Sequence, residues 1–93
     1  MTPEAATQLA ISGLQYLGGD PEQLSRFVAL TGIAPNVIRY QASSPAFLAA
    51  VLDYFLGDEP TLLAFAASFD IKPEDILKAR HALVPPDIVD GWE

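Results

Sequence analysis

Few side chains of this 93-residue chain are of the types that do chemistry, and their spacing does not assemble a site. His81 is the only histidine, and Leu77, one turn earlier on the predicted helix, cannot bind a metal. His81 follows Lys78 and Arg80 near a helix end, where cations are stabilising, so we interpret it as a solvated residue. The absence of cysteine excludes thiolate nucleophiles, disulfides and cysteine metal sites.

Asp53 is the lone charged residue between Pro45 and Gly57. Helical spacing places it on the side of small residues, away from the bulky apolar ones. It is either a buried carboxylate paired with Arg26 or Arg39, or part of the solvent-facing side. Catalysis would need a second titrating group or a nucleophile beside it, which the sequence does not supply. We therefore favour a structural role for Asp53.

Two pairs of acids, Asp58-Glu59 and Glu74-Asp75, stand where helices are predicted to begin. Carboxylates at these positions complement the helix dipole, which explains them without calcium. The chain also has no glycine-rich phosphate loop, no Gly-x-Ser-x-Gly elbow and no histidine–glutamate metal motif. We expect the protein to be no enzyme and to hold no cofactor and no metal.

Val28, Gly32 and Ile38 have the spacing of a DNA-binding helix-turn-helix, and Ala66, Asp70 and Ile76 repeat it more loosely. The same turn is also a common way of packing two helices at a steep angle, and we favour that interpretation. A degenerate transcriptional regulator remains the alternative function.

The polar residues and the net charge of the chain make nucleic acid an unfavourable binding partner. The first candidate recognition helix offers only Asn36, Arg39 and Gln41, and the second begins with Glu74-Asp75, which would repel DNA. The chain carries 5 Lys and Arg against 12 Asp and Glu, a net charge of −7. Because phosphate binding depends on cations, we expect neither nucleic acid nor an anionic membrane surface as a partner.

A protein partner or self-association fits the composition better. Hydrophobic residues make up 51% of the chain and charged residues only 18%, so some apolar surface should remain uncovered. Arginine, tyrosine and tryptophan are frequent where proteins bind each other. Our candidate partner contacts are Arg39, Tyr40, Gln41, Ile88, Val89 and Trp92.

A sequence repeat organises the elements that must position these residues. Residues 16–42 and 55–80 share a pattern that starts at Tyr16-Leu17-Gly18 and at Phe55-Leu56-Gly57, offset by 39 residues and, after the first proline, by 38. The pattern predicts one helix–turn–helix unit used twice. Asp70 stands where the first copy has Gly32, and aspartate tolerates left-handed geometry better than most residues.

Apolar spacing predicts an all-α fold of about six short helices. Several begin with a capping side chain followed by proline, and Asp20 with Gln23 forms a variant of the capping box. The helix from Pro45 to Leu56 is apolar or small nearly all round, so we place the two units around it. Residues 1–83 are predicted to form one domain and residues 84–93 a loosely held acidic tail.

The predicted core collects four large apolar residues from the helix Pro45 to Leu56 and one or two from each of the other elements. Truncating one of its phenylalanines should cost about 3–5 kcal/mol. The predicted core residues are Leu17, Leu24, Phe27, Ile33, Ile38, Leu48, Val51, Leu52, Phe55, Leu62, Phe65, Ile71 and Ile76.

No spanning segment and no signal peptide are evident in the sequence, so we expect a cytoplasmic protein. Between about Leu9 and Leu83 the chain carries the motifs Leu24-x-x-Phe27, Thr31-Gly32-Ile33-x-Pro35, Ile38-Arg39, Pro45-x-Phe47-Leu48-x-x-Val51-Leu52-Asp53, Asp58-Glu59-Pro60 and Leu62-Leu63-x-Phe65. Over this range it resembles a family of small bacterial, mainly alphaproteobacterial, proteins known only as a domain of unknown function. The resemblance implies a bacterial cytosolic protein without an assigned activity, and it supplies no catalytic residue.

Overall fold

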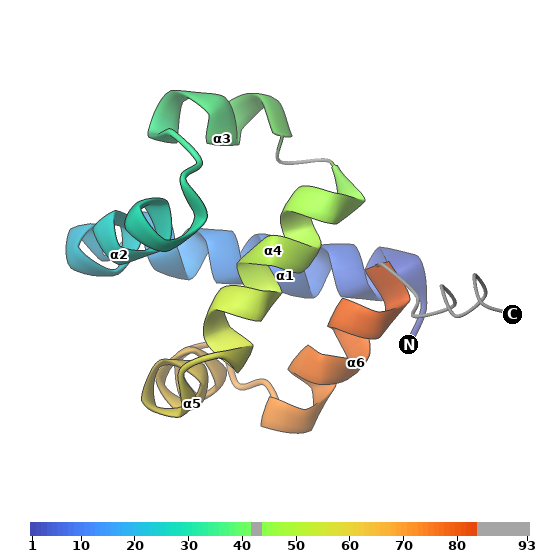
Figure 1. The fold of residues 1–93 in the computed structure, drawn as a ribbon. Helices are drawn as coiled ribbons and strands as arrows, with labels where there is room; N and C mark the ends of the chain where they lie inside the picture. Colours follow the sequence, from blue (N-terminus) through green and yellow to red (C-terminus); the bar gives the residue numbers. More distant parts are fainter. Residues whose placement is uncertain (42–43, 84–93) are drawn as a thin grey trace, which may run out of the picture.

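The computed structural model describes residues 1–41 and 44–83, apart from the side chains of Pro35, Arg39 and Gln41. Within these residues the fold is all-α, with six helices and no strand, as the sequence predicts (Figure 1). The helices are α1 Pro3–Gly18, α2 Pro21–Thr31, α3 Pro35–Gln41, α4 Pro45–Leu56, α5 Glu59–Ser68 and α6 Pro73–Leu83.

The predicted caps begin three of the helices. The side chains of Thr2, Asp20 and Ser44 accept backbone N–H bonds at the starts of α1, α2 and α4, each with proline in the first turn. The reach-back of Gln23 expected for a capping box is replaced, because the Asp20 N–H donates to the carbonyl of Leu17 at 3.1 Å. The side chain of Gln23 bonds to Tyr54 instead.

The helix α4 lies at the centre of the fold, where it crosses α1 and packs on α5 and α6 (Figure 1). It contributes more buried residues than any other helix within the described ranges. Gly13 of α1 allows this close crossing, since a Cβ there would stand 3.0 Å from the Phe55 ring and 3.3 Å from Val51. A side chain at position 13 would therefore push α1 away from α4.

The two predicted repeat units pack differently on this centre. The second, α5 and α6, is tightly integrated, because α6 packs on both α1 and α4. The first is looser: α2 packs on α1, whereas α3 stands apart and packs least closely of the helices (Figure 1). Both turns pass through a left-handed residue at the matching position, Gly32 with φ 74° and Asp70 with φ 56°.

The core agrees with the sequence prediction in its large residues. The fully buried predicted residues are Leu17, Phe27, Leu48, Val51, Leu52, Phe55, Phe65 and Ile76. The remaining predicted residues are partly buried and pack against these, and they are Leu24, Ile33, Ile38, Leu62 and Ile71. The core also includes residues outside that prediction, among them Ala6, Ala10, Phe47 and Tyr54.

Candidate functional site

Asp53 forms a structural ion pair, but with a partner that the sequence analysis did not consider. Its carboxylate accepts two bonds from Arg80 of α6, at 2.8 Å from Nε and 3.2 Å from Nη2. Arg26 pairs instead with Asp58. The Asp53–Arg80 pair joins α4 to α6, and the bond to Asp53 raises the pKa of the Arg80 guanidinium.

His81 lies exposed in the last turn of α6, beside the paired Arg80. Among residues 1–41 and 44–83, no group of three or more His, Cys, Asp or Glu side chains is arranged to hold a metal ion.

The helix-turn-helix spacing corresponds to a tight turn between α2 and the short helix α3. Gly32 takes the left-handed conformation that ends α2, and Val28 and Ile38 are partly buried against the core. The second candidate recognition helix, α6, buries Ile76 and Ala79 completely against its neighbours. Its start carries acids, with Asp75 paired to a lysine one turn later.

The candidate partner contacts near α3 are described only in part. Tyr40 is 80% exposed, the largest exposed fraction among the large apolar residues that the structure describes. The side chains of Arg39 and Gln41 lie outside the described part, as do Ile88, Val89 and Trp92. Their role in partner contact stays a prediction.

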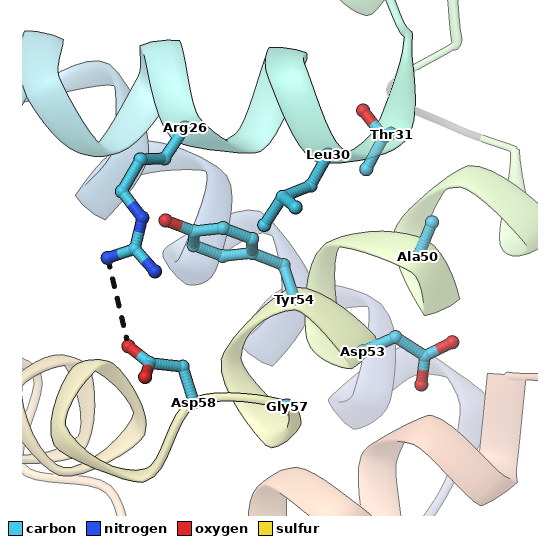
Figure 2. Close-up of a pocket in the computed structure, with 8 residues that line it drawn as sticks. All are labelled: Arg26, Leu30, Thr31, Ala50, Asp53, Tyr54, Gly57 and Asp58. Atoms are coloured by element: carbon cyan, nitrogen blue, oxygen red, sulfur yellow. Dashed lines mark ion pairs between the residues drawn. The ribbon is translucent and has the colours of Figure 1, made fainter.

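A surface groove between α2 and α4, with a volume of about 360 Å³, brings together residues that the sequence analysis did not connect (Figure 2). We call it the α2–α4 groove. Its walls are Arg26, Leu30 and Thr31 from α2 and Ala50, Asp53 and Tyr54 from α4. Gly57 and Asp58, in the connection from α4 to α5, complete it.

Tyr54 forms the floor of the groove and is held rigidly. Its hydroxyl donates to the side-chain oxygen of Gln23 at 2.6 Å. Its ring packs edge-on against the rings of Phe27 and Phe55, with centroids 5.5 Å away in each case. The side chain is only 8% exposed, and burial raises the pKa of its phenol. The hydroxyl is therefore a structural anchor rather than a ready acid.

Charged groups form the rim of the groove. The Arg26 side chain extends from α2 toward Asp58, and the Nη1 atom of Arg26 is 3.9 Å from the Oδ2 atom of Asp58 (Figure 2). Asp58 also accepts a hydrogen bond from the hydroxyl of Thr61. The carboxylate of Asp53 points away from Asp58 on the other side of the floor (Figure 2). The rim thus holds two carboxylates and one guanidinium.

Between these charges the surface is apolar. Leu30 is 71% exposed although it stands beside the buried Tyr54 ring. Thr31 donates its hydroxyl to the carbonyl of Phe27 at 2.8 Å, so its methyl group faces the groove (Figure 2). Ala50 and Gly57 are small and leave the space above the ring open. The arrangement can take an apolar side chain next to a charged one.

Comparison with known proteins places the chain in a family but gives it no activity. Residues 3–86 match the family described as a protein of unknown function, DUF3572. The chain belongs to this family. No curated protein and no solved structure matches the chain at a significant level. The resemblance noted in the sequence is thereby confirmed as membership of a family whose function is not assigned.

In this DUF3572 protein, the described residues include no helix both long and apolar enough to cross a membrane. The sequence analysis did not predict that Tyr54 of α4 packs against α2 and forms the floor of the groove. One signal was present: Leu30 is apolar but lies off the face shared by Leu24, Phe27 and Val28. An apolar residue outside the buried stripe of a helix is a candidate contact.

Proposed function

We propose that this protein is a small cytoplasmic protein-interaction module, with no catalytic role, that binds its partner through the α2–α4 groove. The observation that carries the proposal is Leu30, a leucine 71% exposed at the edge of an open, largely apolar groove. Exposed apolar surface beside a concavity is typical of protein contacts. The cytoplasmic location rests on the sequence alone.

The groups that line the groove support docking more than catalysis. Three of the four titratable side chains of the lining are hydrogen-bonded within the fold: Tyr54 with Gln23, Asp58 with Thr61, and Asp53 with Arg80. A general acid or base must instead be free to reach a proton on a substrate.

Substitution of Leu30 by serine tests the proposal. Wild-type protein and Leu30→Ser are immobilised at equal density and used to capture proteins from a lysate of the organism that encodes the chain. We expect a specific protein to bind the wild type, and its recovery to fall about tenfold with Leu30→Ser, the ratio that corresponds to 1.4 kcal/mol. Leu77→Ser is the matched control, because Leu77 is a 47% exposed leucine on α6, away from the groove.

Three outcomes decide between the occupants. A protein lost with Leu30→Ser but retained with Leu77→Ser supports the module. Light scattering of the full chain shows whether a second copy is the partner, since Leu30→Ser would then convert a dimer to a monomer. A strictly monomeric chain with no captured protein that depends on Leu30 contradicts the proposal. Both variants should melt like the wild type, because exposed substitutions change stability by less than about 0.5 kcal/mol.

A further inference from the structure

We propose that the segment filling the α2–α4 groove belongs to a different protein and carries an arginine or lysine next to an apolar side chain. This inference rests on the proposed function and names the chemistry of the partner. The apolar side chain covers Leu30 and the Tyr54 ring, and the cation reaches the carboxylates of the rim.

The apolar part of the inference follows from what lines the centre of the groove. Leu30, the methyl group of Thr31, Ala50 and the Tyr54 ring offer a surface with no free polar group, since the Tyr54 hydroxyl is directed to Gln23. Water forms no hydrogen bonds with such a surface, so covering it with an apolar side chain is favourable.

The net charge of the chain decides whether a cation or an anion is favoured beside the apolar side chain. Asp58 lies near Arg26 and Asp53 is bonded to Arg80, so the rim is balanced locally, whereas the chain as a whole carries a net charge of −7. The summed field therefore attracts a cation and repels an acid. A second copy of this chain, being equally acidic, is disfavoured for the same reason.

The rim carboxylates also have capacity left for a new partner. The closest Arg26–Asp58 contact is 3.9 Å, longer than a hydrogen bond, so Asp58 is not fixed to Arg26. Asp53 is 51% exposed despite its bonds to Arg80. A carboxylate has about four acceptor sites, so both can accept from an incoming guanidinium or ammonium group. The aliphatic stem of that side chain would lie over Leu30.

Selection from a random peptide library displayed on phage tests this inference directly. The full chain is the bait, and enriched peptides are sorted by whether they still bind Leu30→Ser. We expect the Leu30-dependent peptides to be positively charged, with arginine or lysine beside a leucine, an aromatic or another large apolar residue.

Measurements on one selected peptide, made as a free synthetic peptide, then test the role of the rim. Asp58→Asn should weaken binding about three- to fivefold, as expected for an exposed ion pair. Asp70→Asn is the matched control: it removes the same charge from an exposed position outside the groove and should change affinity by less than about 1.5-fold. The Asp58 side chain makes no capping bond to the backbone of α5, and the amide oxygen of asparagine can still accept from the Thr61 hydroxyl, so Asp58→Asn keeps the start of α5.

The outcomes separate this inference from the proposed function. Leu30-dependent peptides that are neutral or acidic, or that bind Asp58→Asn and Asp70→Asn equally, overturn the basic partner and leave the groove as a docking site. The absence of any Leu30-dependent peptide overturns both. A dimer of the wild type that Leu30→Ser dissociates would identify the occupant as a second copy and also overturn the inference.

Discussion

At the scale of single residues, Tyr54 connects the groove to the core. One edge of its ring packs among phenylalanines, its hydroxyl is bonded to Gln23 across to α2, and its other side lines the groove. The sequence does not distinguish Tyr54 as a groove residue, because the helix that contains it is apolar or small nearly all round. Only the packing of α2 against α4 shows that Tyr54 joins the two helices, beside the contact of Phe47 with Phe27.

The raised pKa of Tyr54 predicts a loss of stability in alkali. Its ordinary value is 10.0, and burial raises it in the native state. The native state thus holds the phenol proton more tightly than the unfolded chain does. The resulting stabilisation is fully present below pH 10.0 and is lost as the pH rises through the native pKa. The free energy of unfolding should therefore fall above pH 10.0 more steeply for the wild type than for Tyr54→Phe.

Urea unfolding at neutral pH and at about pH 11 checks this prediction. At neutral pH, Tyr54→Phe should cost about 1 kcal/mol, because the side-chain oxygen of Gln23 loses its donor. Tyr40→Phe removes a hydroxyl from an exposed ring and should unfold like the wild type at neutral pH. Parallel pH profiles for the wild type and Tyr54→Phe would show that Tyr54 is not the group responsible.

The role of Asp53 could be predicted from the sequence only in part. The sequence indicated a buried carboxylate in an ion pair or a solvent-facing acid, and the structure has one feature of each, since Asp53 is paired but half exposed. Distance along the chain could not identify the partner, because Arg26 and Arg80 are equally far from Asp53 in the sequence. The approach of Arg80 depends on how α6 is placed between α1 and α4.

At the scale of elements, the helix boundaries were well predicted because capping and turn residues act locally. Thr2, Asp20 and Ser44 accept the backbone bonds expected of them, and Gly32 ends α2 in the left-handed conformation. The unequal packing of α3 and α6 could not be predicted, since the two occupy matching places in the repeat. The helix α6 packs on α1, α4 and α5, whereas α3 packs least closely of the described helices (Figure 1). The repeat as an organising unit stays a prediction.

The left-handed turn after α2 can be tested with two glycines that differ in backbone conformation. A Cβ at Gly32 or at Gly18 would have nothing within 4 Å, so neither substitution by alanine causes a clash. Gly32 has φ +74°, where an L residue costs about 1–2 kcal/mol. Gly32→Ala should therefore destabilise by about that amount in thermal or urea unfolding.

Gly18→Ala is the matched control for this prediction. Gly18 is helical and ends α1, so alanine there should be neutral or should stabilise by up to about 1 kcal/mol. Equal effects of the two substitutions would mean that the conformation of Gly32 does not matter to the fold.

At the scale of the whole molecule, stability depends on a small core shared by all the major helices. Phe27 and Phe65 are both 0% exposed, one on α2 and one on α5. Phe27→Ala and Phe65→Ala should each cost about 3–5 kcal/mol, a large part of the stability of a domain this size. We expect both variants to lose cooperative thermal melting, followed by far-UV circular dichroism.

Phe69→Ala serves as the comparison for these two variants. Phe69 contacts the Phe65 ring but is 36% exposed, so its truncation should lower the melting temperature and keep the transition cooperative. Normal melting curves for both Phe27→Ala and Phe65→Ala would contradict the core as described.

The whole molecule also shows why the core could be predicted and the groove could not. Large apolar residues at helical spacing are most stable when they are buried. The burial of Phe27, Leu52 and Phe65 could therefore be predicted from the sequence. The groove is instead what remains open after packing, and its lining combines α2, α4 and the connection to α5. Such a surface depends on how closely α2 and α4 approach, which no single residue of the sequence specifies.

The packing of the aromatic rings has an optical consequence. All five phenylalanines and two of the three tyrosines form one continuous series of ring contacts, from Phe47 to Phe69. The near-ultraviolet signal of these rings therefore reports the packed interior as one unit. Since Tyr54 belongs to the series and also floors the groove, a ligand that enters the groove changes the environment of a built-in chromophore.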